Sequence, residues 1–230
     1  MKILTIDIGG SNVKITLLNE EGNPLSEYKK LPTPQPSTPA NIIATIKTLI
    51  TGISAFDRIS AGFPGYVKKG VIKTAPNLGT EYWKDYDLQK ALSETFKCPA
   101  KVVNDADLQG IGLVSGNGLE MVITLGTGFG TALLEDGKLL PHLELAHHPI
   151  KTNKVYDDYV GEKAYEKKGK AHWNERIKKV IGILKTVFNY DHLYISGGNA
   201  RNIDFPLDSN ITIVSNKDGI KGGARLWKSL

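Results

Sequence analysis

Two glycine-rich segments of the chain carry polar residues of the kind that hold phosphate groups. The first, residues 7–14, reads DIGGSNVK and follows a short apolar run. Glycine lets backbone N–H groups close on oxyanions, a carboxylate can hold Mg²⁺ through water, and a serine or lysine can reach terminal oxygens. The segment matches neither GxGxxG nor GxxxxGKS/T, which excludes the dinucleotide-binding and Walker motifs. A hairpin turn that merely needs glycine is the alternative interpretation.

The second segment, residues 124–130, reads TLGTGFG and has the same design. Its glycines stand at alternate positions, and the hydroxyl of Thr127 lies among them. Two such loops could clamp one phosphate chain from both sides. Two simple hairpin turns are again the alternative, although both loops have polar residues beside their glycines.

A carboxylate that could act as a general base follows a short apolar run. Residues 104–107 read NDAD and lie between a predicted strand and a predicted helix. Polar groups there should project from the edge of a sheet into a cleft. In phosphoryl transfer the base is commonly an aspartate that touches the attacking hydroxyl. The alternative is that Asn104 or Asp105 only caps the helix.

Glu144 and His147 provide hydrogen-bonding groups suited to a sugar. A glutamate can accept hydrogens from two neighbouring hydroxyls, and a histidine can add another bond. Zinc is the rival interpretation. It needs three or four ligands at close range, and the sequence has neither HExxH nor a cysteine pair.

Hydrophobic spacing predicts a mixed α/β chain that positions these motifs at strand ends. A strand, a glycine turn and a second strand occur twice, near Asp7 and near Thr127, which suggests two lobes of related design with a cleft between them. Residues 32–39 hold four prolines and should form an extended connector. The predicted strands are residues 3–8, 13–18, 25–30, 59–63, 101–103, 121–125, 131–134 and 193–196, and the predicted helices are residues 40–53, 87–96, 106–113, 174–188 and 224–230.

Composition favours a soluble globular protein and excludes several other classes. The 230 residues are 40% hydrophobic and 23% charged, which excludes a disordered chain and an integral membrane protein. A formal charge of +5 favours an anionic ligand without naming one. A single cysteine, Cys98, excludes a disulfide framework and is expected to be a half-buried thiol. With no signal peptide or apolar run of about 20 residues, we expect a cytoplasmic protein without a membrane partner.

Taken together, these segments resemble the ROK family of sugar kinases, and especially its polyphosphate glucokinase branch. DIGGSNVK resembles DIGGSGIK of that branch, residues 103–107 resemble VNDAD, and residues 124–133 resemble TLGTGIGSAL. Residues 143–147 resemble the ELGH motif, and residues 195–198 resemble a glycine-rich turn near the nucleotide base. Matches at residues 63–65 and 75–78 follow the same order along the chain.

The resemblance implies a two-lobed actin-like ATPase fold, related to ribonuclease H, with a central mixed sheet in each lobe and a cleft between the lobes. The N-terminal lobe would be residues 1–103, with a C-terminal helix of about residues 219–230 packing back on it. The C-terminal lobe would be residues 104–218.

The same resemblance implies roles for individual residues. Asp105 would be the general base on the primary hydroxyl of the sugar, and Asp7 would help to organise Mg²⁺ through water. The implied sugar ligands are Asn104, Glu144, His147, Gly65 and Asn77. The implied donor ligands are Asp7, Gly9, Gly10, Ser11, Lys14, Gly126, Thr127 and Gly128, with Gly197 and Gly198 lining a purine pocket if the donor is a nucleotide.

The sequence departs from the family pattern in three places, which affects the roles that the resemblance implies. The zinc motif CxCGxxGCxE that many members carry after the sugar-binding histidine is absent, so no zinc is expected. The glutamate that ends this motif contacts sugar in the family, and Glu162 is the candidate to replace it. Ala146 replaces the glycine that precedes the histidine in the family, and Asn12 replaces another small residue in the first loop, so the local backbone geometry is expected to differ.

The resemblance favours polyphosphate, ATP or both as donor, with glucose as acceptor. An ATP-dependent kinase for another hexose or an N-acetylated sugar is the alternative. Homodimers are common in the family, but the sequence reveals no self-complementary face. A basic track for a polyanion could use Lys14, Lys68, Lys69, Lys73, Lys151, Lys154, Lys167, Lys168 and Lys170, all of which could equally be solvated surface residues.

Two other classes of protein share parts of this pattern. A sugar-responsive DNA-binding regulator would carry a helix-turn-helix segment ahead of the core, whereas the core strand here begins near Lys2, so no nucleic-acid partner is expected. The mixture of lysines and aromatics in residues 165–173 is only a weak sign of nucleic-acid binding. A catalytically silent sugar-binding module would be expected to lose the base or the phosphate loops, and both are present.

Overall fold

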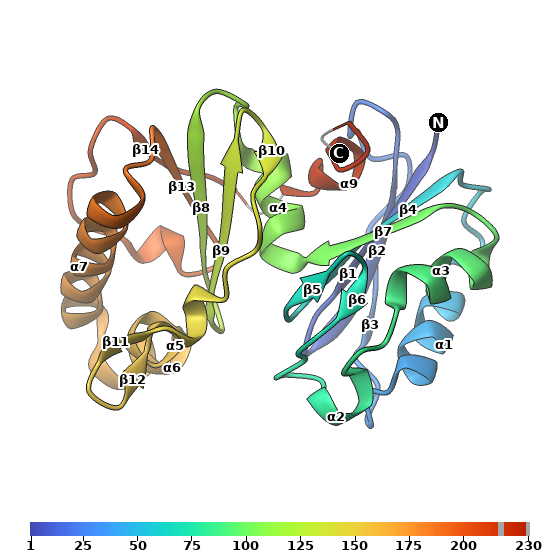
Figure 1. The fold of residues 1–230 in the computed structure, drawn as a ribbon, viewed down its shortest axis with the longest axis horizontal. Helices are drawn as coiled ribbons and strands as arrows, with labels where there is room; N and C mark the ends of the chain where they lie inside the picture. Colours follow the sequence, from blue (N-terminus) through green and yellow to red (C-terminus); the bar gives the residue numbers. More distant parts are fainter. Residues whose placement is uncertain (216–218, 229–230) are drawn as a thin grey trace. The chain divides into compact units, whose positions relative to one another are not determined.

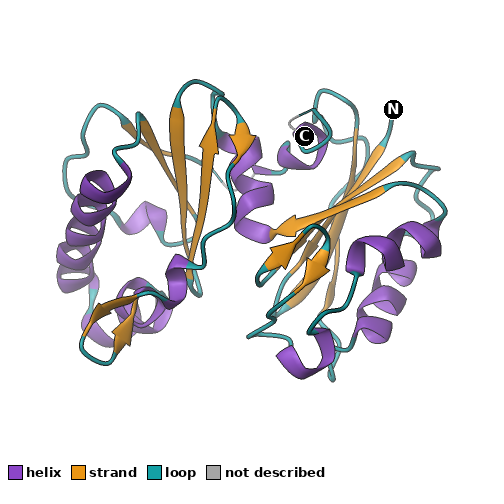
Figure 2. Ribbon diagram, in the orientation of Figure 1, coloured by secondary structure: helices purple, strands orange, loops and turns teal. Residues whose placement is uncertain are grey.

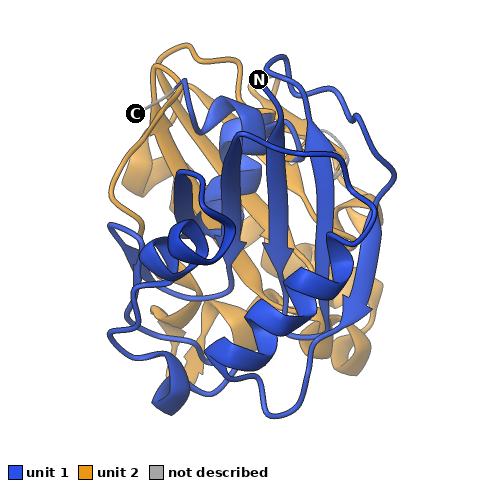
Figure 3. Cartoon of the chain, turned by 90° about the vertical axis from the view of Figure 1, so that its right-hand side faces the viewer, with its two compact units in different colours: residues 1–112, 220–230 blue, residues 113–219 orange. Residues whose placement is uncertain are grey.

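The computed structural model describes residues 1–215 and 219–228. The chain forms two compact units, which Figure 3 shows in different colours: unit 1 is Met1–Gly112 with Ile220–Leu230, and unit 2 is Leu113–Gly219. From the sequence, the division is expected after residue 103. Unit 1 extends further because the helix after that point packs on its sheet, with Leu108 close to Gly62.

Unit 1 is built on a five-stranded sheet with the order β3-β2-β1-β4-β7 (Figure 1). Strand β1 (Ile3–Ile8) pairs antiparallel with β2 (Asn12–Leu18) and parallel with β4 (Arg58–Phe63). Strand β7 (Ala100–Asn104) extends the parallel part, and β3 (Lys29–Pro32) forms the opposite edge. The sheet is therefore mixed, with three neighbouring strands running in the same direction.

The two faces of this sheet differ in chemistry. One face is apolar and packs against α1 (Pro39–Leu49) and α3 (Leu88–Phe96) through Ile42, Ile46 and Leu92. Thr38 caps α1 and Asp87 caps α3, each accepting a hydrogen bond from a backbone N–H of the first turn. The other face is partly polar and meets α9 (Gly222–Arg225), whose glycines allow close contact: a Cβ at Gly223 would collide with the Thr5 side chain.

Unit 2 repeats the arrangement of the unit 1 sheet. Its five strands follow the order β10-β9-β8-β13-β14, in which β8 (Leu119–Leu125) pairs antiparallel with β9 (Phe129–Glu135) and parallel with β13 (His192–Ser196). The long helix α7 (Lys170–Phe188) covers one face with Trp173, Ile177 and Val180 in a shared core. The prediction of two sheets of related design is confirmed.

Short elements complete both units, and Figure 2 distinguishes the helices from the strands. In unit 1 they are β5 (Val67–Lys68), β6 (Val71–Ile72), α2 (Thr80–Trp83) and α4 (Asp105–Leu113), which continues by one residue into unit 2. In unit 2 they are β10 (Lys138–Leu139), η1 (Leu145–His147), β11 (Pro149–Lys151), β12 (Lys154–Val155), α5 (Tyr156–Val160), α6 (Glu162–Lys168), η2 (Ala200–Asn202) and β14 (Ile211–Ile213).

The predicted strand at residues 25–30 is largely wrong, because β3 begins only at Lys29. Ser26 takes the place of a strand partner: its hydroxyl accepts the N–H of Leu17 at 2.9 Å, and its carbonyl accepts the hydroxyl of Thr16 at 3.1 Å. The apolar Leu25 and Tyr28 are then left exposed. The helix predicted at residues 224–230 is displaced to Gly222–Arg225, and residues 229–230 lie outside the described part.

Cys98 is half-buried, as expected, and burial raises the pKa of its thiol. Across residues 1–215 and 219–228, the structure contains no helix that is long and apolar enough to pass through a membrane.

Candidate active site

In unit 1, the predicted site residues gather where three neighbouring parallel strands end. The register places Asp7 of β1 opposite Gly62 of β4, and Phe63 of β4 opposite Asn104 of β7. Because parallel strands end at the same edge of a sheet, ligands commonly bind there. The structure therefore brings the first glycine loop and the NDAD segment to one edge of one sheet.

Asn104 fixes the start of α4 at this edge. Its side-chain amide donates to the carbonyl of Gly65 at 3.1 Å, and its Oδ1 accepts the N–H of Ala106 at 2.8 Å. The capping interpretation is thus confirmed for Asn104, which is 6% exposed. Its buried amide reaches Gly65, so these two predicted sugar ligands lie together.

Asp105 lies on the face of the sheet that carries Asp7. A Cβ built on Gly62 would stand 3.1 Å from the Cα of Asp105. Residues that are opposite each other in register point to the same face, and neighbouring strands lie about 4.8 Å apart. Gly62 therefore leaves room for the first turn of α4 directly beside Asp7, and the Asp105 side chain is half-buried there.

The first glycine loop is a tight hairpin turn that Thr33 stabilises by a hydrogen bond. The N–H of Gly9 donates to the carbonyl of Asn12 at 2.9 Å, and the hydroxyl of Thr33 donates to the carbonyl of Gly9 at 2.6 Å. A Cβ on Gly10 would stand 3.3 Å from the Cβ of Asn77. Ser11 at the tip is exposed. The loop is thus a hairpin, as the alternative interpretation has it, and it leaves its tip open to a ligand.

Asp7 and Lys14 form an ion pair beside this loop. The Lys14 ammonium lies 3.0 Å from Asp7 Oδ2, and both side chains are about one-third exposed, at 40% and 32%. Mg²⁺ usually keeps several waters and takes one or two carboxylates together with substrate phosphates. One accessible carboxylate fits that pattern. No cluster of three or more His, Cys, Asp or Glu side chains suited to a metal occurs in the part of the chain that the structure describes.

In unit 2, the second glycine loop, Gly126–Gly128, is anchored by a residue that the sequence analysis did not single out. Asp157 Oδ1 accepts the N–H of Phe129 at 2.6 Å, and a Cβ on Gly128 would stand 2.9 Å from the same oxygen. Burial raises the pKa of the Asp157 carboxyl, against the lowering effect of the Phe129 N–H. No sequence motif marks Asp157, because the contact depends on how α5 packs on the hairpin.

The turn at Gly197 and Gly198 lies beside the second loop. Gly197 has a φ of +97°, and a Cβ there would collide with the backbone of Leu125, the last residue of β8. The N–H of Asn199 donates to the carbonyl of Leu125 at 2.9 Å. Gly198 is exposed with open space around it. Two predicted donor segments of unit 2 are therefore neighbours.

Glu144 lies between two imidazoles. His142 Nε2 is 3.4 Å from Glu144 Oε1, and His147 Nε2 is 3.7 Å from Glu144 Oε2. The His142 side chain is 7% exposed, whereas that of His147 is 53% exposed. No sequence motif marks His142, although it lies only two residues before Glu144.

The structure does not bring Glu162 into this group. Its backbone N–H donates to the carbonyl of Gly126 at 3.0 Å, while its side chain is exposed at the start of α6. The charges of His147 and Glu144 both act on the pKa of the Asp157 carboxyl, which burial raises.

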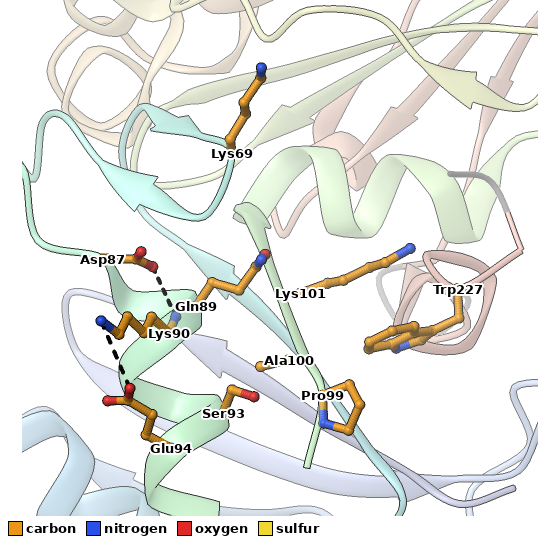
Figure 4. A pocket seen from close by; sticks show the side chains of 10 residues that line it. All are labelled: Lys69, Asp87, Gln89, Lys90, Ser93, Glu94, Pro99, Ala100, Lys101 and Trp227. Atoms are coloured by element: carbon orange, nitrogen blue, oxygen red, sulfur yellow. Dashed lines mark hydrogen bonds and ion pairs between the residues drawn. The ribbon is translucent and has the colours of Figure 1, made fainter. Parts of the chain in front are cut away.

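A pocket of about 450 Å³ in unit 1 lies away from the predicted site residues. It opens at the outer edge of β7 (Figure 4). Lys69, one of the lysines considered for a basic track, lines it, and none of the predicted catalytic, sugar or donor ligands does. The lining residues are Lys69, Asp87, Gln89, Lys90, Ser93, Glu94, Pro99, Ala100, Lys101 and Trp227.

Comparison with known proteins identifies the family. The ROK family profile matches residues 3–150 of the chain. This chain belongs to the ROK family. The polyphosphate glucokinase of Mycobacterium leprae (strain TN) is 31% identical over 236 residues, which cover 95% of this chain and 72% of the relative. That of Mycobacterium tuberculosis (strain ATCC 25618 / H37Rv) is 30% identical over 95% of this chain and 88% of its own length.

Solved structures of ROK proteins agree with this assignment. The inorganic polyphosphate/ATP-glucomannokinase from Arthrobacter sp. strain KM has a TM-score of 0.86 and 27% identity, covering 99% of each chain. A ROK glucokinase from Streptomyces griseus, solved with glucose and AMPPNP, has a TM-score of 0.80 and 18% identity over 98% of this chain and 99% of the other.

These findings confirm the predicted actin-like ATPase fold and the resemblance to ROK kinases. They also confirm that this ROK protein is an enzyme, a phosphotransferase with an alcohol acceptor.

Proposed function

We propose that this ROK protein transfers the terminal phosphoryl group of inorganic polyphosphate or ATP to the 6-hydroxyl of glucose. The observation that carries the proposal is the position of Asp105, which shares one sheet face with Asp7 and the first glycine loop. A base and a phosphate-binding loop on the same edge of a sheet are what phosphoryl transfer to an alcohol needs. The names of the mycobacterial and Arthrobacter relatives support both the donors and the acceptor.

Asp105 takes the proton of the sugar hydroxyl as its oxygen attacks the terminal phosphorus. The bond between that phosphorus and the bridging oxygen breaks, and the bridging oxygen leaves as the new end of ADP or of a shortened polyphosphate. Asn104 helps to position the acceptor, because its own position is fixed by Gly65 and by the start of α4. Asn77, next to Gly10, is assigned to the same ligand set.

Donor binding in unit 1 is assigned to Asp7, Gly9, Gly10, Ser11 and Lys14. Mg²⁺, when bound, would neutralise charge on the donor phosphates. Asp7 would hold it through water, and Lys14 keeps the Asp7 carboxylate in place by their ion pair. In unit 2 the assigned donor ligands are Gly126, Thr127 and Gly128, with Gly197 and Gly198 beside the base of a nucleotide donor.

Glu144 and His147 bind further hydroxyls of the sugar. Oε1 of Glu144 is buried beside His142, whereas the Glu144 side chain as a whole is 29% exposed and can accept a hydrogen bond from a ligand. We assign to Asp157, not Glu162, the role of the second acidic residue near the sugar. Mannose is the second candidate acceptor, because the name of the Arthrobacter relative includes it.

The test crosses ATP, GTP and polyphosphate with glucose, mannose and N-acetylated sugars in a coupled assay. Phosphorylation of glucose by polyphosphate or ATP is expected, and activity only with an N-acetylated sugar would refute the acceptor. Asp105→Asn should lower kcat by about 10²- to 10⁴-fold while sugar binding survives. Glu94→Gln, an exposed acidic residue of α3, is the matched control and should retain normal turnover.

A further inference from the structure

A row of charged residues crosses the unit 1 sheet from the predicted active site to its edge strand. Asp7 of β1 is opposite Lys14 of β2, and Lys14 is opposite Lys30 of β3. Residues paired in this way point to the same face. The neighbours Val13, Ile15 and Leu31 pack into the apolar core, so the three charged residues face the other side.

The two lysines of this row are unusual neighbours. Like charges directly opposite each other on a sheet are destabilising. The negative charge of Asp7 offsets the positive charge of Lys14, because the Lys14 ammonium lies 3.0 Å from the Asp7 carboxylate. Lys30 is exposed, and no ion pair to it occurs within residues 1–215 and 219–228. A Lys ammonium has three donors, so both lysines retain hydrogen-bonding capacity for an external anion.

The row also has a direction. It begins where Gly62 accommodates Asp105, passes Asp7 beside the first glycine loop and ends at Lys30. Three strand spacings of about 4.8 Å separate Gly62 from Lys30, roughly 14 Å in all. A short donor that reacts near Asp105 would end before Lys30, whereas a long linear polyanion could continue along the row.

We propose that Lys14 and Lys30 form a track that binds the phosphates of a long polyphosphate donor beyond the group being transferred. This inference rests on the proposed function, because it assumes that the donor reacts beside Asp105 and Asp7. It assigns to Lys30 a role in distinguishing long polyphosphate from ATP. Lysines bind phosphates as point charges, which suits a flexible chain without a fixed register.

The experiment compares Lys30→Ala with the wild type, using ATP and sodium polyphosphate fractions of short and long mean chain length. For long polyphosphate, KM should rise about tenfold, the loss of one charge-assisted contact. KM for ATP and for glucose, and kcat with ATP, should stay within about twofold of wild type. Lys47→Ala removes one exposed charge from α1, on the opposite face of the sheet, and should change none of these values.

A stability measurement separates binding from a structural role. Because Lys30 faces another lysine, Lys30→Ala should leave Tm unchanged or slightly higher. A lowered Tm with equal losses for all donors would overturn the proposal and assign Lys30 a structural role. If wild type uses polyphosphate and Lys30→Ala shows the same chain-length dependence, only the track is refuted. If wild type transfers phosphate from ATP but not from polyphosphate, the proposed donor is wrong and the track is refuted with it.

Discussion

The Cα of Asp105 lies 3.1 Å from the point where a Cβ on Gly62 would stand. Gly62 is also the register partner of Asp7, so one missing side chain allows the base and the loop carboxylate to share a sheet face. This glycine does not have a positive φ. Glycine is required at position 62 because α4 approaches the sheet closely there. A Cβ on Gly62 would also stand 3.1 Å from the Leu108 side chain of α4.

Gly62→Ala should therefore lower kcat more than it raises KM. The added methyl group must push the first turn of α4 away from the sheet, and overpacking of this kind costs about 1–3 kcal/mol. A shift of a few tenths of an ångström in the helix turn that carries Asp105 misaligns the base, and the loss of turnover should be smaller than the roughly 10²-fold that a misplacement of about 1 Å can cause. Steady-state kinetics and urea unfolding of the variant would measure both effects.

The matched control is Gly182→Ala in α7, where an added Cβ meets nothing within 4 Å. Alanine in an exposed helix should stabilise the protein by roughly 0.5–1 kcal/mol and leave kcat unchanged. Full turnover in Gly62→Ala would show that the position of Asp105 tolerates the shift, and would remove Gly62 from the catalytic argument.

His142 should act as a positioning residue for Glu144. It is 7% exposed and approaches Glu144 Oε1 at 3.4 Å, so it can hold the carboxylate toward the sugar without touching the sugar itself. His142→Leu should raise KM for glucose about tenfold, with little change in KM for the donor, because Glu144 loses its orienting partner. Initial-rate measurements at saturating donor would test this.

His142→Asn provides the comparison, since its amide also places a hydrogen-bond donor beside Glu144. It should recover most of the affinity for glucose. Equal losses in the leucine and asparagine variants, or a loss that affects kcat alone, would contradict the positioning role.

The sequence predicts the parts of the site that depend on local chemistry. Motifs in the sequence mark the glycine loops, the polar end of β7, and Glu144 with His147. Each of these groups consists of residues only a few positions apart, so their spacing along the chain is enough to reveal them. Gly62, Asp157 and His142 act through contacts that folding creates. Asp157 meets Phe129 across 28 positions of the chain, and no pattern in either segment reveals that pairing.

The same distinction explains the errors in the fold. Periodicity correctly predicts the long helix α7 and the buried strands, whose apolar residues repeat over many positions. The prediction fails at residues 25–28, where a strand is expected but the side chain and carbonyl of Ser26 accept hydrogen bonds from β2 instead. Side-chain competition for backbone groups is decided by tertiary contacts rather than by the hydrophobic pattern.

Glu120 should make the stability of unit 2 depend on pH. Its fully buried carboxylate accepts the hydroxyl and the N–H of Ser115, the N–H of Gly116 and the hydroxyl of Tyr194 at 2.7–3.0 Å. Burial alone would raise its pKa, but these bonds outweigh burial and lower the pKa below the ordinary value of 4.5. A lowered folded-state pKa stabilises the protein above the unfolded value, and this contribution is lost as the pH falls through the folded one.

Glu120→Gln should therefore cost roughly 2–3 kcal/mol of unfolding free energy at pH 7, since an uncharged amide cannot replace the charge-assisted bonds and brings its own N–H groups to a site of donors. The difference from wild type should shrink as the pH falls below about 4.5, where wild type must protonate Glu120 as it unfolds. Urea titrations of both proteins between neutral and acidic pH would measure the trend. Glu135→Gln, an exposed residue of β9, is the control and should show little difference at any pH. A constant gap between wild type and Glu120→Gln across that range would mean that the loss comes from packing rather than from the charge.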